Sequence, residues 1–136
     1  MKLEINNTTK QSINRKLLQK AADIFGKKMG FSQAEVSLAI VGKSKIQDLN
    51  NNCRGIDKAT DVLSFTFDQS KDFLGEIIIC YQQIKQQAKQ QGIPEEDELV
   101  FIFIHGLLHL VGYNDEKSKD REEMIKIGQK LCKSIV

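Results

Sequence analysis

The stretch "FIFIHGLLHLVGYND", residues 101–115, decides the fold of this chain and contains its only two histidines. His105 and His109 lie four residues apart inside an otherwise apolar run. Pro94 and the acids that follow it are typical of a helix start, because carboxylates stabilise the positive end of a helix dipole. A helix that is apolar nearly all round is buried. The sequence therefore predicts a central, buried helix that ends near Gly112.

The two histidines are candidate metal ligands. Positions i and i+4 share one face of a helix, about 6 Å apart along its axis, so two imidazoles can bind one ion. A catalytic zinc site uses three protein ligands in a roughly tetrahedral arrangement. Asp115 is the nearest acidic side chain that the turn at Gly112 could return to the same ion. The alternative is that His105 and His109 are core histidines, but the sequence favours a metal site of His105, His109 and Asp115.

The segments on either side of this helix predict an α+β domain. Alternating apolar residues indicate strands, and apolar residues at 3.6-residue spacing indicate helices. The predicted order is β-α-β-α-β-β-α-α-α, which gives a four-stranded mixed sheet with about five helices packed on it. The expected strands cover residues 2–7, 34–42, 62–67 and 74–80, with a turn at 68–72. Of the expected helices, the first is capped by Ser12 and the second by a capping box of Ser44 and Gln47. The third begins at Tyr81, the fourth with Pro94 and the acids after it, and the last at about Ser118.

Length and composition predict one domain, residues 1–136, with room for a core. The three cysteines are an odd number without a C-x-x-C spacing, so neither a disulfide framework nor a cysteine zinc site is expected. The N-terminus lacks an apolar signal segment, and the longest apolar run is shorter than the ~20 residues that span a bilayer. We therefore expect a reduced, cytoplasmic protein without a membrane partner.

The charges are unevenly distributed. Residues 1–60 carry eleven Lys and Arg against five Asp and Glu, whereas residues 61–136 carry nine against thirteen. A basic half can face a polyanion such as RNA, although a solvated helix face gives the same pattern. The cations that could line a groove leading to the metal are Lys10, Arg15, Lys16, Lys20, Lys27 and Lys28.

Arg54 is the candidate phosphate ligand. We expect it in a loop between a short helix and a buried strand, and its guanidinium can bind two phosphate oxygens at once. Pairing with Asp57 or Asp61 on the surface is the alternative, and the sequence pattern does not choose between the two. The sequence also leaves two roles for Gly106: it could allow the close approach of a substrate or another backbone, or simply the packing of the helix on the sheet.

Three blocks of the sequence resemble those of one known family. "HGLLHLVGYND" is similar to the H-G-x-L-H-L-x-G-Y-D-H signature of the YbeY family, metal-dependent endoribonucleases implicated in rRNA maturation. "LNNNCRGIDKATDVLSFTF", residues 49–67, and "LGEII", residues 74–78, resemble two further blocks of that family. The chain departs from the signature at its end, where Asn114 and Asp115 replace Asp-His. The spacing of the three candidate ligands is nevertheless kept.

The resemblance implies a single-strand-specific, metal-dependent endoribonuclease. It implies a role in maturation of the 3′ end of small-subunit rRNA and in ribosome quality control, with the ribosome or its proteins as partners and no DNA substrate. It further implies catalytic roles for Arg54 and His105 and one Zn²⁺ per chain. With aspartate as the third ligand, the site is less positive than one of three imidazoles, and another divalent ion such as manganese is possible.

Two other functions remain open. The first is a non-enzymatic ribosome-assembly factor with a structural or weakened metal site, which the changed third ligand allows. The second is an atypical metallopeptidase. Because position 106 is glycine, the glutamate that acts as general base in the H-E-x-x-H peptidase motif is missing, which counts against the peptidase.

Overall fold

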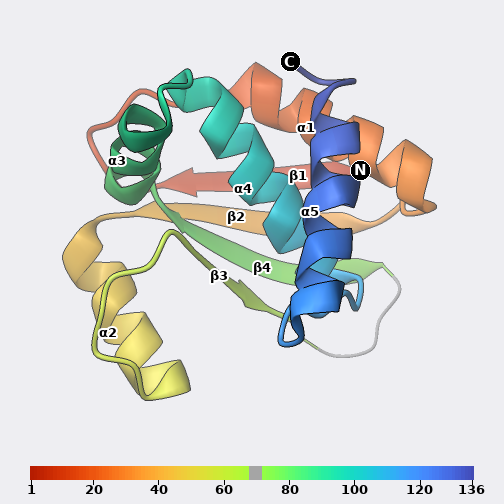
Figure 1. The fold of residues 1–136 in the computed structure, drawn as a ribbon. Coiled ribbons are helices and arrows are strands. Elements are labelled where there is room, and N and C mark those ends of the chain that lie inside the picture. The colour runs from red at the N-terminus through yellow and green to blue at the C-terminus, as the bar shows by residue number, and fades with distance from the viewer. Residues whose placement is uncertain (68–71) are drawn as a thin grey trace.

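The structure, a computed structural model, describes residues 1–67 and 72–136 (Figure 1). The turn predicted at 68–72 therefore falls almost wholly outside the described residues. The predicted order of strands and helices is confirmed. The elements are β1 (Lys2–Asn7), α1 (Arg15–Met29), β2 (Glu35–Val41), α2 (Lys43–Arg54), β3 (Val62–Phe65), β4 (Phe73–Cys80), α3 (Tyr81–Gln91), α4 (Glu95–Leu110) and α5 (Ser118–Cys132).

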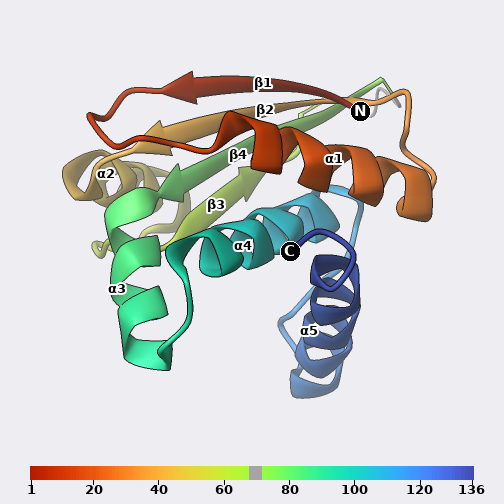
Figure 2. The same cartoon turned by 90° about the horizontal axis from the view of Figure 1, so that it is seen from above.

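The four strands form one mixed sheet in the order β1-β2-β4-β3. β1 and β4 both run parallel to β2, whereas β3 pairs antiparallel with β4. Figure 2 shows α1, α4 and α5 on the same side of the sheet. α2 covers part of the opposite face, where Ile46 packs with Leu63 and Ile78 in a second, smaller cluster. The predicted α+β fold with a four-stranded mixed sheet and five helices is thus confirmed.

The apolar helix predicted from residues 101–115 is the buried centre of the main layer. α4 begins after Pro94, carries four acids in its first turn, and buries residues on every side of its axis. A Cβ added at Gly106 would lie 3.1 Å from Cγ2 of Ile77 and 3.3 Å from Oγ of Ser64. The glycine therefore serves the close packing of α4 on the sheet.

Two predicted helix starts are wrong. The side chain of Asn14, and not that of Ser12, caps α1 by accepting the N–H of Leu17. α2 begins at Lys43 after Gly42, without a side-chain cap, so Ser44 lies inside the first turn and forms no capping box. α2 follows β2 with only Gly42 between them, so this glycine, and not a capping side chain, precedes its first turn.

Candidate metal centre

The three predicted metal ligands come together at the end of α4. His105 and His109 lie in its last two turns, and the helix ends at Leu110. Gly112 then adopts a positive φ of 104° that reverses the chain. The Asn114 side chain accepts the N–H of Glu116 at 2.7 Å, which shapes the following turn. Asp115 is thereby directed back toward the two imidazoles.

The ligand atoms form an almost equilateral triangle. Nε2 of His105 lies 3.2 Å from Nε2 of His109, and each nitrogen lies 3.4 Å from Oδ2 of Asp115. Tetrahedral zinc binds nitrogen and oxygen at ~2.0–2.2 Å, which separates neighbouring ligand atoms by about 3.3–3.6 Å. The observed distances fit this value. In the described parts of the chain, this is the one group of three or more metal-ligating side chains.

The environment favours the imidazole form that can bind a metal. Burial lowers the pKa of His105, and the neighbouring His109 lowers it further, while Asp115 partly opposes both effects. The side chains of His105 and His109 are 18% and 29% exposed, so both rings are accessible from one side. A neutral imidazole presents a lone pair to an ion, whereas a protonated one does not.

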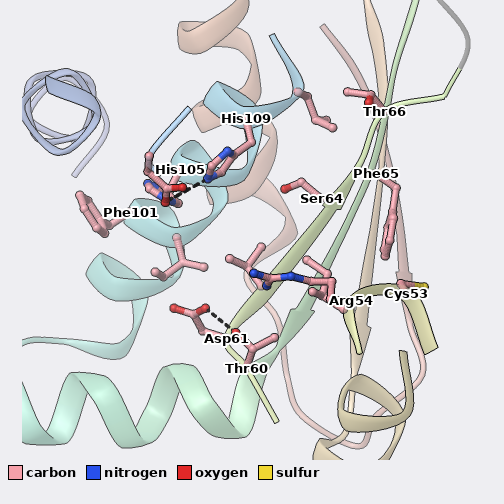
Figure 3. A pocket seen from close by; sticks show the side chains of 15 residues that line it. Cys53, Arg54, Thr60, Asp61, Ser64, Phe65, Thr66, Phe101, His105 and His109 are labelled. Carbon is pink, nitrogen blue, oxygen red and sulfur yellow. Dashed lines mark hydrogen bonds and ion pairs between the residues drawn. The ribbon is translucent and has the colours of Figure 1, made fainter. Parts of the chain in front are cut away.

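The triangle opens into a cleft of about 560 Å³ (Figure 3). One wall is α4, with Phe101, His105 and His109. The other wall comes from the end of α2, the following loop and β3. It contains Arg54, Thr60, Asp61 and Ser64 among its lining residues. The cleft volume is within the usual range for small-molecule and substrate sites.

Arg54 is the last residue of α2, so the predicted loop position is wrong by one residue. Its guanidinium extends across the cleft toward the wall that carries the histidines (Figure 3). Within the described chain it forms no ion pair. Asp57 accepts a hydrogen bond from Gln47, and Asp61 accepts bonds from Thr60 and Gln87. The alternative of a surface pair with either aspartate is therefore not found, and the guanidinium can receive an anion.

Sequence reasoning did not identify Phe101 as a wall residue of the cleft. The Phe101 ring stacks on His105, with centroids 6.4 Å apart, and it is one helical turn earlier on the same face. That spacing could have identified it. Ser64 lies within the predicted strand, in β3, where it lines the cleft and its hydroxyl donates to the carbonyl of Gly106 at 3.4 Å.

The basic residues of α1 do not reach the cleft. The described lining residues of the cleft include none of them. Lys20 donates to the carbonyl of Ile135 and Lys28 to the hydroxyl of Ser134, so both bind the C-terminal segment. The groove of lysines leading to the metal is not found. Across the described helices, none combines the length and apolar character needed to cross a membrane.

The fold and the site thus define an α+β domain in which three candidate metal ligands face Arg54 across a cleft. The family model described as "Endoribonuclease YbeY" matches residues 2–136. The chain therefore belongs to the endoribonuclease YbeY family.

Relatives and a solved structure agree with this assignment. The endoribonuclease YbeY of Persephonella marina is 32% identical, over 92% of this chain and 86% of that protein. The Francisella philomiragia protein of the same name is 37% identical, over 88% and 81%, and that of Leptospira interrogans is 35% identical, over 83% and 94%. The solution structure of TM1509 from Thermotoga maritima aligns with a TM-score of 0.70 and 30% identity, over 98% of this chain and 88% of that one.

Proposed function

We propose that residues 1–136 form one metallohydrolase domain that cleaves single-stranded RNA with a divalent ion held by His105, His109 and Asp115. Zinc is the first choice of ion. The observation that carries the proposal is the triangle of ligand atoms, 3.2–3.4 Å on each side, opening into the cleft that Arg54 enters. Membership of a family whose relatives are named endoribonucleases supports RNA as the substrate.

The chain's own residues have distinct roles in this proposal. A bound ion would supply Lewis acidity to a phosphate oxygen or lower the pKa of a water molecule. Arg54 would bind the nonbridging oxygens of the scissile phosphate and stabilise the charge that develops on them. His105, as both ligand and wall residue, would fix the phosphate relative to Arg54. The nucleophile would be water or the ribose 2′-hydroxyl.

The third ligand sets the choice of metal in this proposal. Two neutral imidazoles and one carboxylate leave a divalent site with a charge of about +1, where three imidazoles would leave about +2. Carboxylate oxygen suits harder ions such as manganese better than a third imidazole does. We therefore expect activity with manganese as well as zinc.

The biological setting belongs to the same proposal. Maturation of the 3′ end of small-subunit rRNA and ribosome quality control in the cytoplasm would supply single-stranded RNA substrates, and the ribosome or its proteins would be the partners. DNA would not be a substrate, since the 2′-hydroxyl distinguishes RNA at such a site. In the described structure, Arg54 is the only cation that lines the cleft, so a partner would supply much of the RNA contact.

The test combines metal analysis with RNA cleavage. We expect the purified wild type to contain about one ion per chain and to cut a single-stranded RNA, but not duplex RNA or the matching DNA. Arg54→Ala should keep the ion and lose most, but not all, of the cleavage, whereas His105→Ala should lose both the ion and the cleavage. Asp115→Ala should bind the ion more weakly. Unchanged cleavage in both the Arg54 and His105 variants would indicate a contaminating nuclease and would refute the proposal.

The changed third ligand favours one alternative: a ribosome-assembly factor whose metal is structural or weakly bound. In that case His109→Ala would support full growth of cells that depend on the protein. The peptidase is disfavoured because position 106, where a catalytic glutamate would stand, faces Ile77 and Ser64 of the sheet. Peptide cleavage without RNA cleavage at the same metal loading would reverse this preference.

A further inference from the structure

Asn50 is a buried polar residue on the helix that carries Arg54. It is 2% exposed and lies one helical turn before Arg54 in α2. Ile46, another turn earlier, is the other buried residue of that helix and packs into the smaller core cluster. The buried stripe of α2 therefore continues through position 50, where helical spacing leads one to expect an apolar side chain.

The Asn50 amide is only half used. Its Oδ1 is the one buried side-chain nitrogen or oxygen in the described structure without a hydrogen-bond partner. A buried acceptor without a partner loses its hydration and gains nothing in return, so an apolar residue of similar size would be the more stable choice. The amide is therefore explained by what its NH2 group does.

That NH2 group binds the loop that follows Arg54. Nδ2 of Asn50 donates to the carbonyl of Lys58 at 3.0 Å, and this bond fixes the orientation of the amide, because a carbonyl can only accept. The backbone carbonyl of Asn50 accepts the N–H of Gly55 and, at 3.4 Å, that of Ile56. The side chain thus holds the fourth residue of the loop, whereas the start of the loop is held by the backbone carbonyl, which every side chain at position 50 would leave in place.

The same loop builds one wall of the cleft. Arg54 is the residue before it, and Thr60 and Asp61 near its end line the cleft. Because Arg54 forms no ion pair within the described structure, its own side chain has no charged partner to orient it. The direction of the guanidinium then depends on where the backbone at 54–58 is held.

We propose that Asn50 is a positioning residue that holds Arg54 and the loop at 55–61 in place for the scissile phosphate. This inference rests on the proposed function, since it concerns the placement of Arg54 at the same cleft. A matched control is available on the same helix. Gln47 also binds the loop, through its exposed Nε2 and Asp57 Oδ1 at 3.0 Å, but it is not buried and holds neither backbone end.

The first test separates stability from activity. Asn50→Leu removes the NH2 donor and the unpartnered oxygen together, with Asn50→Ala as a smaller replacement should leucine not fit. We expect a melting temperature at or above that of the wild type, an unchanged metal content, and a fall in kcat/KM for a single-stranded RNA of about ten- to a hundredfold. Gln47→Ala should change kcat/KM less than about twofold. Wild-type kcat/KM in a folded Asn50→Leu protein would overturn the proposal.

The second test asks whether Asn50 acts through Arg54. In the Arg54→Ala background, Asn50→Leu should reduce the remaining cleavage by less than about twofold, because the group that it positions is already absent. A full, multiplicative loss would show that Asn50 supports the fold generally, and would overturn the proposal.

A third measurement does not depend on cleavage. Amide hydrogen exchange of the metal-loaded protein should show faster exchange at Gly55 and Ile56 in Asn50→Leu and no change in α4. Unchanged exchange at 55–61 would refute the positioning role. If the wild type cut no RNA, the proposed function would fail, and this measurement would still show whether Asn50 holds the loop.

Discussion

Gly75 in β4 is the position where a single side chain would be least tolerated. Its φ is 142°, and a Cβ there would overlap the carbonyl oxygen of Phe65 on the neighbouring strand. The obstacle is backbone, which cannot rotate away as a side chain can. We expect Gly75→Ala to lower the free energy of unfolding by about 2–4 kcal/mol, as measured by urea denaturation.

Gly92 provides the matched control at the same scale. It also has a positive φ, of 68°, but a Cβ there would meet no atom within 4 Å. Gly92→Ala should therefore lower the free energy of unfolding by only about 1–2 kcal/mol, which is the cost of holding alanine in the left-handed conformation. Equal losses in the two variants would show that the approach of Phe65 to Gly75 contributes nothing.

At the scale of the elements, the start of α1 depends on Asn14. Its Oδ1 accepts the N–H of Leu17 at 3.1 Å, and its Nδ2 donates to Glu96 of α4 at 3.0 Å. We expect Asn14→Ala to lower the free energy of unfolding by about 1 kcal/mol. Ser12→Ala should stay within about 0.5 kcal/mol of wild type. A larger loss at Ser12 would mean that Ser12 is the cap after all.

These two residues also show where sequence reasoning reaches its limit. The 3.6-residue periodicity of α1 was sufficient to predict the helix, because that signal is local. The choice between Ser12 and Asn14 as the cap is not local. It follows from the contact between Asn14 and Glu96, which are 82 residues apart in the chain.

The candidate site also has one part that the sequence could predict and one part that it could not. His105, His109 and Asp115 could be predicted because they lie on one helix and the turn after it, and the spacing alone implies their convergence. The position of the facing wall could not be predicted from the sequence. The direction of Arg54 depends on Asn50 and the loop, and the distance of this wall from α4 depends on how the helix packs on the sheet. The lysines of α1 looked equally suitable in sequence for binding RNA near the metal site, but none of them lines the cleft.

The junction of α3 and α4 gives an expectation for pH. The Tyr81 hydroxyl donates to Glu95 at 3.1 Å, and burial, followed by that carboxylate, raises the pKa of Tyr81 to about 12. The unfolded chain releases this proton near its ordinary value of about 10. The folded state therefore holds the proton more tightly, and the stability from this group is complete below pH 10 and lost as the pH rises toward 12.

Tyr81→Phe isolates this contribution. Other groups titrate in the same range, so the informative quantity is the difference in unfolding free energy between wild type and variant. We expect this difference to favour wild type more at pH 9 than at pH 11.5, as measured by urea denaturation at each pH. A constant difference across that range would contradict the raised pKa of Tyr81.

At the scale of the whole molecule, the cleft is made where two separate segments meet. Residues 53–66 supply one wall and residues 101–115 the other. The antiparallel edge strand β3 packs against α4, and this packing sets the distance between the walls (Figure 2). Unfolding separates the segments and removes the turn that returns Asp115 to the histidines. A metal ion at this site should consequently bind the folded state in preference to the unfolded one.

This preference predicts stabilisation by zinc. Free zinc at a hundred times its dissociation constant should raise the free energy of unfolding by about 2.7 kcal/mol. For a chain of this size, that corresponds to a rise in melting temperature of roughly 10 °C, measured by calorimetry and reversed by a chelator. His109→Ala should abolish the rise, whereas Cys53→Ala, which removes an exposed thiol that lines the cleft but is not among the three candidate ligands, should preserve it. An equal rise in His109→Ala would place the ion elsewhere in the molecule and remove the basis for a metal in the cleft.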